Sequence, residues 1–346
     1  MKRTTVKDIG RLLDVSPSTV SRALADHPDI SAGTKTRVRD VAEALGYIPN
    51  LRARYLRARH SRLVALVVPE MNMFFVPSLM TGINRVLQQN DYSLVVFQSD
   101  DAVVQERKLV RLCLNLSIDG VLLARSSETT ELSHLEALRA ADIPAVLLDK
   151  IIETDRHSTV SIDDARASRE ATDYLLDRGH TSVVGVFGDI RQRICALRKD
   201  GFRAAFAARG LPAAAAPVVE VRLLDAFDDA FAAALDAHPA ATAVFVMSDE
   251  LLVRAHHVLL RRGARIPDDL SLVAISDGYA PYFLFPNVTH IRHSGAEVGL
   301  KAAHVLVGMM QPHDTGAEID VRVQTRIVEL ESVRTLAAAE PHARAS

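Results

Sequence analysis

From Leu63 onward the chain alternates short apolar runs with longer segments of helical periodicity, and this alternation limits the possible folds more than any other feature. Four runs come first, and the series restarts at Ser182 with four more. They read LVALVVP, SLVVFQ, DGVLLA and PAVLLD, then SVVGVFG, APVVEV, TAVFVM and LSLVAIS. Runs that are apolar at nearly every position suit parallel strands covered on both faces by helices. We therefore expect an α/β domain of two doubly wound parallel-sheet subdomains.

Polar and aromatic side chains follow most of these runs, at the sheet edge where ligands bind in such folds. The set comprises Phe74, Phe75, Asp100, Arg125, Asp149, Asp163, Asp164, Ser248, Asp249, Ser276 and Asp277. A polar residue after a strand also serves as a helix cap, which is the simpler interpretation of any single member. Taken together, the set predicts a cleft that binds a small molecule.

The stretch from Thr4 to Leu24 predicts two short helices joined by a tight turn. Thr5 and Asp8 have the spacing of a capping box, and Ser16 followed by Pro17 suits the start of the second helix. Val6, Ile9, Gly10 and Leu13 fall on one face of the first helix, and Val15 with Val20 can form a hydrophobic staple. The pattern indicates a helix-turn-helix, and a pair of capped surface helices is the alternative.

The exposed face of the second helix is small, polar and singly basic. It carries Ser18, Ser21 and Arg22, while Val20, Ala23 and Leu24 face inward. Such a helix can enter a major groove, where Arg grips a guanine edge and hydroxyl groups bind phosphates or bases.

Charge is distributed unevenly along the chain. Residues 1–62 hold 13 Lys and Arg against 6 Asp and Glu, a net charge of +7, whereas the remainder carries −9. A basic patch beside a helix-turn-helix attracts polyanions, so double-stranded DNA is the predicted partner of this end.

A third helix and a basic segment complete the N-terminal region. Ser31 can cap a helix with a buried stripe of Val38, Val41, Ala42 and Leu45, and Gly46 can end it. The segment YIPNLRARYLRARHSR that follows has five Arg and few apolar residues. Because it cannot bury enough surface alone, we expect it to fold on DNA, with a flexible basic linker as the alternative.

Motifs of catalysis and metal binding are missing from the sequence. There is no dinucleotide or phosphate loop after a strand, no HExxH and no spaced Cys and His cluster, so we expect no catalytic residue, metal or cofactor. Cys113 and Cys195 lie outside any CxxC pattern and are expected to be reduced core thiols. The N-terminus has no apolar secretory core and no apolar run spans a membrane, which predicts a cytoplasmic protein without membrane contact.

Four motifs in one order carry a family resemblance: TVKDIGRLLDVSPSTVSRAL, ALGYIPN, RGH at Arg178 to His180, and GARIPDDLSLVAIS. Over nearly its whole length the chain resembles the LacI/GalR family of bacterial transcription regulators. The resemblance implies an all-α helix-turn-helix headpiece ahead of a periplasmic-binding-protein-like domain. It also implies a dimer that reads the half-sites of a palindromic operator and is controlled by a small molecule, commonly a sugar or nucleobase.

The resemblance assigns DNA contacts in three groups. Pro17, Ser18 and Arg22 would face bases. Expected backbone anchors are Thr5, Ser16, Thr19, Ser21, Tyr47 and Asn50. Ala53 and Leu56 match the positions that enter the minor groove.

It also assigns effector contacts. Phe74 and Phe75 belong to a turn in which Met73 replaces the family's Pro, Asp163 matches an interdomain crossover contact, and Arg198 matches the residue that grips the effector. Further cleft positions are Asp149, Ser248, Asp249, Ser276 and Asp277. Ser276 stands where many members have a ligand-binding Asp, and the segment around Leu223 lacks an aromatic platform.

The predicted boundaries are a headpiece at 1–48, a hinge at 49–62, an effector and dimerisation domain at 63–338, and a tail at 339–346. Within the large domain we expect an N-subdomain of about 63–161 and 293–322 and a C-subdomain of about 162–291 and 323–338. The tail has no leucine heptad, which favours a dimer over a tetramer. The main hypothesis is a LacI-type repressor with a sugar-like effector. Alternatives are control by a protein partner or nucleobase, a transport-type small-molecule-binding protein, or an enzyme.

Overall fold

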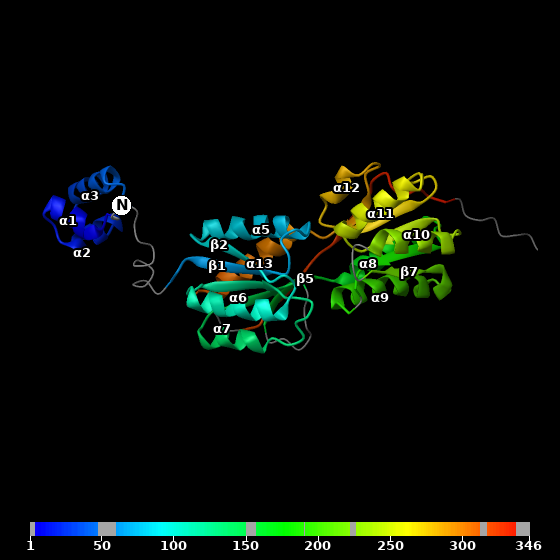
Figure 1. The fold of residues 1–346 in the computed structure, drawn as a ribbon, viewed down its shortest axis with the longest axis horizontal. Coiled ribbons are helices and arrows are strands. Elements are labelled where there is room, and N and C mark those ends of the chain that lie inside the picture. The colour runs from blue at the N-terminus through cyan, green and yellow to red at the C-terminus, as the bar shows by residue number, and fades with distance from the viewer. Residues whose placement is uncertain are drawn as a thin grey trace, which may run out of the picture. The chain divides into compact units, whose positions relative to one another are not determined.

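The computed structural model describes residues 4–47, 60–149, 157–189, 191–221, 226–311 and 317–336. They form two compact units, Met1–Ser61 and Arg62–Ser346, each with its own core (Figure 1). Predictions for Asn50, Ala53, Leu56 and Leu223 lie outside the described residues.

The first unit contains three short helices. They are α1 (Val6–Leu13), α2 (Pro17–Leu24) and α3 (Ala32–Ala44). Their small core consists of buried apolar side chains, namely Ile9, Val20, Ala23, Val38 and Ala42. The predicted caps are confirmed, since Thr5 and Asp8 form a capping box and the hydroxyls of Ser16 and Ser31 accept hydrogen bonds from the Thr19 and Thr34 amides.

The turn between α1 and α2 depends on a close approach at Gly10. A Cβ atom there would lie 2.7 Å from the carbonyl oxygen of Val15, nearer than real Cβ contacts come. The amide of Val15 in turn donates to the Gly10 carbonyl at 3.0 Å. Glycine therefore allows α2 to start immediately beside α1.

The end of α3 differs in one respect from the prediction. Gly46 has a left-handed φ of +59°, as its predicted role requires, and the Tyr47 amide donates to the Ala42 carbonyl at 2.8 Å. The prediction for Leu45 was wrong, because its side chain is 39% exposed. Leu45 is the C-cap, so it has left the helical face to which the stripe belongs.

The second unit is built around two six-stranded sheets. The first has the order β11-β5-β4-β3-β1-β2 and is parallel throughout. Its strands are β1 (Leu63–Val68), β2 (Ser93–Gln98), β3 (Gly120–Ala124), β4 (Ala145–Leu148), β5 (Ser158–Ile162) and β11 (Asp320–Val323).

The second sheet has the order β12-β10-β9-β8-β6-β7. Its strands are β6 (Val183–Phe187), β7 (Val218–Glu220), β8 (Ala243–Val246), β9 (Ser271–Ser276), β10 (Thr289–Arg292) and β12 (Arg326–Val328). All pairs are parallel except β10 with β12, an antiparallel pair at one edge.

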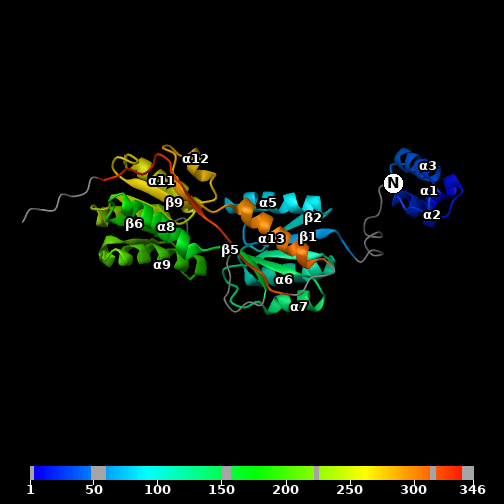
Figure 2. The same ribbon diagram turned by 180° about the vertical axis from the view of Figure 1, so that it is seen from behind.

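Helices cover both faces of each sheet. Over the first sheet lie α5 (Phe75–Gln89) and α13 (Gly295–Met309), side by side, with α6 (Val103–Asn115) and α7 (Glu136–Ala140) opposite (Figure 2). Over the second lie α8 (Asp164–Asp177) and α9 (Arg193–Ala208), with α10 (Phe227–Ala237) and α11 (Asp249–Arg261) opposite. Shorter elements are α12 (Ala280–Phe283) and the 3₁₀ turns η1 (Ser133–Leu135) and η2 (Ala213–Ala215).

Each of the eight apolar runs contains a strand, which confirms the predicted α/β class. Four strands were not predicted: β5, β10, β11 and β12. Polar residues interrupt them, as in STVSI and THIR, so they lack the continuous apolar signal. All four flank points where the chain passes between the sheets, which lie after β5, after β10 and between β11 and β12.

Candidate functional site

The outer surface of α2 presents hydroxyl groups and one guanidinium. Pro17, Ser18 and Arg22 are exposed, whereas Thr19 and Ser21 are half-buried. The Ser16 hydroxyl lies 2.7 Å from that of Ser18 and 2.8 Å from that of Thr19, in addition to accepting the Thr19 amide. The predicted DNA contacts on α2 therefore begin in a preorganised hydroxyl cluster at the start of the helix.

Basic side chains around α2 differ in whether an acid neutralises them. Lys35 and Arg39 pair with Asp26 at 3.2 and 2.8 Å, and these contacts lower the pKa of Asp26. Among the described residues Arg22 makes no ion pair, so its charge is available to a partner. Thr5 is exposed and hydrogen-bonded to Asp8, and Tyr47 packs half-buried against the headpiece core.

Arg198, the expected effector grip, lies buried in an ion pair in this structure. Its Nε donates to Asp164 Oδ1 at 2.8 Å, and Nη1 donates to the carbonyl of Met247, the residue after β8. Both side chains are nearly inaccessible to solvent. Burial raises the pKa of Asp164 to about 6, while Arg198 opposes that rise. The pair joins the first turn of α8 to α9.

Asp163, the neighbouring residue that was expected to make the crossover contact, is exposed and caps α8. Its Oδ1 accepts the Arg166 amide at 3.0 Å. The sequence placed Asp164 in the polar set after the strands but not among the effector contacts. Burial distinguishes the two carboxylates, and the adjacent letters DD do not reveal which one turns inward.

A second buried polar group links the ends of β8 and β9. Asp249 accepts a short hydrogen bond from the Ser276 hydroxyl and another from the Asp277 amide at 2.9 Å. Burial raises the pKa of Asp249 to about 6, against both hydrogen bonds. Ser248 caps α11 through the Leu251 amide at 3.5 Å. Asp277 accepts the amide of Gly295 at the start of α13.

The remaining predicted effector residues are Phe74, Phe75 and Asp149. The Phe74 amide donates to Glu250 Oε1 at 3.1 Å, a contact between the start of α5 and α11. The Phe75 ring lies 5.2 Å from the ring of His293, in the segment after β10. Burial, followed by Arg198, lowers the pKa of His293 to about 3. Asp149 adopts a left-handed φ of +65°, and its amide donates to Val160 at 3.1 Å.

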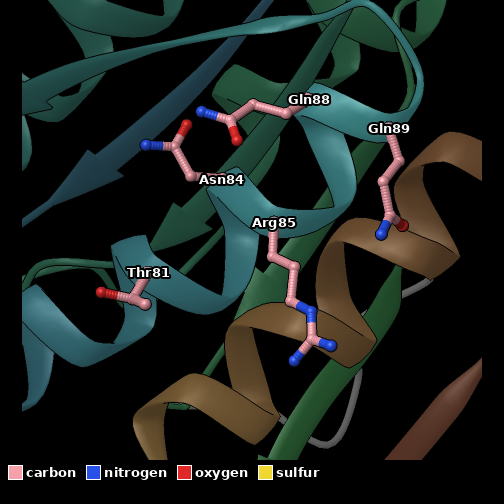
Figure 3. Close-up of a pocket in the computed structure, with 5 residues that line it drawn as sticks. All are labelled: Thr81, Asn84, Arg85, Gln88 and Gln89. Carbon is pink, nitrogen blue, oxygen red and sulfur yellow. The ribbon is translucent and has the colours of Figure 1, made fainter.

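Described residues of the second unit line at least two hollows. One, of about 200 Å³, is bounded by the loop after β3 and by the start of α9. The other, of about 530 Å³, follows one face of α5 beside α13, and Figure 3 shows its polar side chains. These are Thr81, Asn84, Arg85, Gln88 and Gln89. Sequence analysis identified Arg125 in the first hollow and no residue of the second.

Thiol and membrane expectations can be compared with the described part of the chain. Cys113 and Cys195 are buried free cysteines, and burial raises the pKa of the Cys113 thiol to about 11. Within the described ranges no three His, Cys, Asp or Glu gather in a metal-binding group. No helix in those ranges combines the length and apolar character needed to cross a membrane.

Two family profiles match the chain. The profile of bacterial regulatory proteins, lacI family, matches residues 5–50, and that of the periplasmic binding protein-like domain matches residues 172–333. The catabolite control protein A of Priestia megaterium is 27% identical over 317 residues, which cover 91% of this chain and 95% of that protein.

Solved structures support the same fold. A lac repressor dimer bound to operator and the anti-inducer ONPF aligns with a TM-score of 0.84 at 20% identity, covering 96% of this chain and all of that one. A complex of the transcriptional regulator CelR with cellobiose aligns with a TM-score of 0.68 at 24% identity, covering 95% and 100%. The descriptions of these proteins name regulators and no enzyme, in agreement with the expectation from the sequence.

Proposed function

The chain belongs to the LacI family of bacterial regulatory proteins, and from that premise we propose that it represses transcription by binding a palindromic operator as a dimer under the control of a small, sugar-like effector. The observation that carries the proposal is the joining of a basic helix-turn-helix unit to a unit of two parallel sheets in one chain.

The headpiece supports base recognition through α2. Its first turn holds the Ser16 and Ser18 hydroxyls together, and Arg22 projects from its outer face without an acidic partner in the described headpiece. A guanidinium can donate two hydrogen bonds to a guanine edge, while hydroxyls and backbone amides fix the helix on phosphates. In this proposal Arg22 distinguishes one base from another. The hydroxyl cluster fixes the position of the helix along the DNA.

Dimerisation is supported by an apolar surface on the second unit. Tyr279, Tyr282, Phe283 and Phe285 form an exposed aromatic stretch in and around α12, with Phe283 81% and Phe285 88% exposed. His256 Nε2 donates a hydrogen bond to the Phe285 carbonyl at 3.0 Å, so the stretch is anchored to α11. Large exposed apolar surfaces mark interaction sites, and a palindromic operator requires two headpieces related by a twofold axis.

Effector control is supported by the polar groups at the carboxyl ends of the strands. Arg198, Asp164 and the Asp249 cluster lie where ligands enter folds of this type. A ligand changes DNA affinity only if it prefers one arrangement of the protein over another. A small molecule that competes with Asp164 for Arg198 would meet this condition.

The test is to incubate the intact protein with fragmented genomic DNA, recover the retained fragments and sequence them. The proposal predicts one inverted repeat shared by the retained fragments, and a complex whose mass corresponds to two chains per duplex. Retention without a shared motif, or a single chain per specific site, would contradict it. An Arg22→Ala variant in the same experiment shows which base pair the arginine reads.

A further inference from the structure

The second unit consists of two halves, and two carboxylates of one half bind helix starts of the other. The first half is the sheet that contains β1 with its helices, and the second half is the sheet that contains β6 with its helices. Glu250, in the first turn of α11, accepts the Phe74 amide at 3.1 Å. Asp277, which follows β9, accepts the Gly295 amide at the start of α13. Because α5 and α13 belong to the first half, each hydrogen bond joins the two halves.

Both helix starts suit a carboxylate. The first amides of a helix have no partner within it, and the helix dipole places partial positive charge there. The N-cap of α5 makes no side-chain hydrogen bond, and the first turn of α5 contains no acidic residue. Glu250 therefore supplies a negative charge that α5 itself does not provide. At α13 the Ser294 hydroxyl accepts the Glu297 amide, and Asp277 accepts the Gly295 amide beside it.

Close packing joins the two helix starts into one body. The helices α5 and α13 lie side by side over the first sheet (Figure 2). A Cβ atom at Gly295 would lie 2.2 Å from the Ser78 hydroxyl oxygen, and one at Gly82 would lie 2.0 Å from the Ala296 carbonyl oxygen. Such close approach requires the absence of a side chain. A movement of one helix therefore carries the other with it.

The two carboxylates are likewise joined within the second half. Asp249 accepts the Asp277 amide at 2.9 Å and also accepts a hydrogen bond from the Ser276 hydroxyl. Asp249 and Glu250 are neighbours in the first turn of α11. The separation of Glu250 and Asp277 is therefore fixed, as is the separation of the two helix starts that they bind. Both contacts form together in one arrangement of the halves.

These contacts carry a cost that separation of the halves would relieve. Asp277 is 3% exposed, and its Oδ2 has no hydrogen-bond partner among the described residues. Burial raises the pKa of the Asp277 carboxyl. A buried carboxylate oxygen without a partner is unfavourable, and water could reach it if the halves moved apart. Glu250 is half-buried beside the exposed Phe74, so water also competes for that contact.

We propose that Glu250 and Asp277 form a latch that holds the two halves in the arrangement of this structure and opens when the halves change position. The chain passes between the halves through short segments after β5, after β10 and between β11 and β12. Rigid bodies joined in this way can rotate about the joining segments. In this role the two carboxylates position the halves and do not themselves bind an effector. The link to DNA rests on the proposed function, because an effector that prefers one arrangement must act with or against the latch.

The experiment measures the arrangement of the halves in the intact protein without DNA. Spin labels are attached through Lys108→Cys and Arg203→Cys, at exposed positions of α6 and α9 in different halves. Distances between the labels are measured by double electron–electron resonance, with excess unlabelled protein to suppress pairs from different chains. Cys113 and Cys195 are buried, and a labelling reaction on the protein without the two substitutions verifies that they do not react.

We expect Glu250→Ala to change the ratio of the two arrangements about tenfold, as for the loss of one hydrogen bond to a charged group. Adding Asp277→Asn should change the ratio further. Glu250→Gln should restore most of the wild-type distribution, because its amide oxygen can still accept the Phe74 amide. Glu297→Ala is the matched control and should behave as wild type, since Glu297 is an exposed acid in the first turn of α13 within the first half.

Identical distance distributions in the wild type and the double variant would overturn the latch. Far-UV circular dichroism establishes that each variant is folded. If Asp277→Asn does not fold, Glu250→Ala and Glu250→Gln decide the question, because Glu250 is only half-buried. An equal change in Glu297→Ala would also contradict the proposal, since it would show that charge at the helix start matters without a bridge between the halves.

A second arm relates the latch to DNA binding. The operator duplex is added to the labelled Glu250→Ala protein, and we expect it to change the ratio of the two distances by about twofold or more, because DNA and the latch act on one equilibrium. An unchanged ratio when the operator is saturating would contradict the link between the latch and DNA. Absence of operator binding in the wild type would refute the proposed function and leave the distances measured without DNA to decide the latch.

Discussion

Arg22 and Ser18 stand on the same outer face of α2, but physical chemistry gives them different tasks. A guanidinium that makes two hydrogen bonds to a base distinguishes that base from the others, while a hydroxyl group binds bases and phosphates with little discrimination. The exposure of Arg22 and the absence of an acidic partner in the described headpiece leave its donors for DNA.

Arg22→Ala should weaken operator binding by about 1–3 kcal/mol and relax preference at one base pair per half-site. Affinities for operators with each single substitution, measured by fluorescence anisotropy, give the preference directly. Arg11→Ala is the control, since Arg11 is an exposed headpiece arginine that faces Asp8 at 3.9 Å. Unchanged base preference in the Arg22 variant would assign Arg22 to phosphate contact alone.

The buried Arg198 and Asp164 pair should be a structural requirement of the second unit. Removing one partner of a buried ion pair leaves an uncompensated charge and costs about 3–5 kcal/mol, whereas exposed pairs contribute about 0–1 kcal/mol. We expect Arg198→Ala to lower the free energy of unfolding by the larger amount and Arg169→Ala, which removes an exposed pair with Asp173, by the smaller. Urea unfolding followed by circular dichroism measures both. Recovery is expected in the double variant Arg198→Met with Asp164→Leu, and a stable Arg198→Ala protein would argue against the pair's importance.

Asp249 should make the stability of the second unit depend on pH. Its pKa is raised from 3.8 to about 6 in the folded state, so between these values the folded chain holds a proton that the unfolded chain has released. Stability contributed by Asp249 is therefore lost as pH rises from about 4 to 6, by roughly 3 kcal/mol for this shift. Asp249→Asn should remove that dependence. If wild type and variant keep a constant difference in unfolding free energy between pH 4.5 and 7, the carboxyl is not protonated as stated.

Among the elements, the turn between α1 and α2 depends on the space at Gly10. Gly10→Ala places a Cβ against the Val15 carbonyl, so the headpiece must distort, with a loss of about 1–3 kcal/mol and of operator affinity. Gly33→Ala in α3 is the matched control, because nothing lies within 4 Å of its Cβ position and alanine favours a helix by about 1 kcal/mol. Separate melting of the two units by calorimetry locates the effect. Normal operator binding by Gly10→Ala would show that the turn tolerates a side chain.

Elements that depend on local chemistry were predictable from the sequence. The caps at Thr5, Ser16 and Ser31 and the eight apolar runs act over a few residues, and the structure has helices and strands at those places. The strand β5 was not predicted because its sequence, STVSI, is rich in Ser and Thr, whereas a strand buried on both faces was expected to be apolar throughout. A sheet interior accepts such residues when their hydroxyls find partners, as Ser158 and Thr159 do beside β11.

The candidate sites were harder to predict because they are assembled from distant parts of the chain. Arg198 and Asp164 are separated by 34 positions. No periodicity in the sequence indicates which of the adjacent carboxylates, Asp163 or Asp164, turns inward. The hollow of about 200 Å³ likewise combines the loop after β3 with the start of α9, which are distant in the sequence.

Across the whole molecule, charge is divided between a basic DNA-binding end and an acidic remainder. The N-terminal 62 residues carry a net +7, and the rest of the chain carries −9, so attraction to a polyanion is concentrated in the DNA-binding unit and its basic continuation. A duplex that binds two such units releases counterions from many phosphates at once. Repulsion of DNA by the acidic remainder should further restrict binding to the headpieces.

The most direct test of this account is the salt dependence of binding to the operator identified by sequencing, measured with the intact protein between 50 and 300 mM potassium chloride. Each phosphate neutralised adds about 0.9 to the slope of log affinity against log salt concentration, so two headpieces should give a slope of several units. Specific affinity for the inverted repeat should persist above that for a scrambled duplex at every salt concentration. A flat salt response, or equal affinity for the repeat and the scrambled duplex, would contradict the conclusion that this chain is an operator-binding regulator.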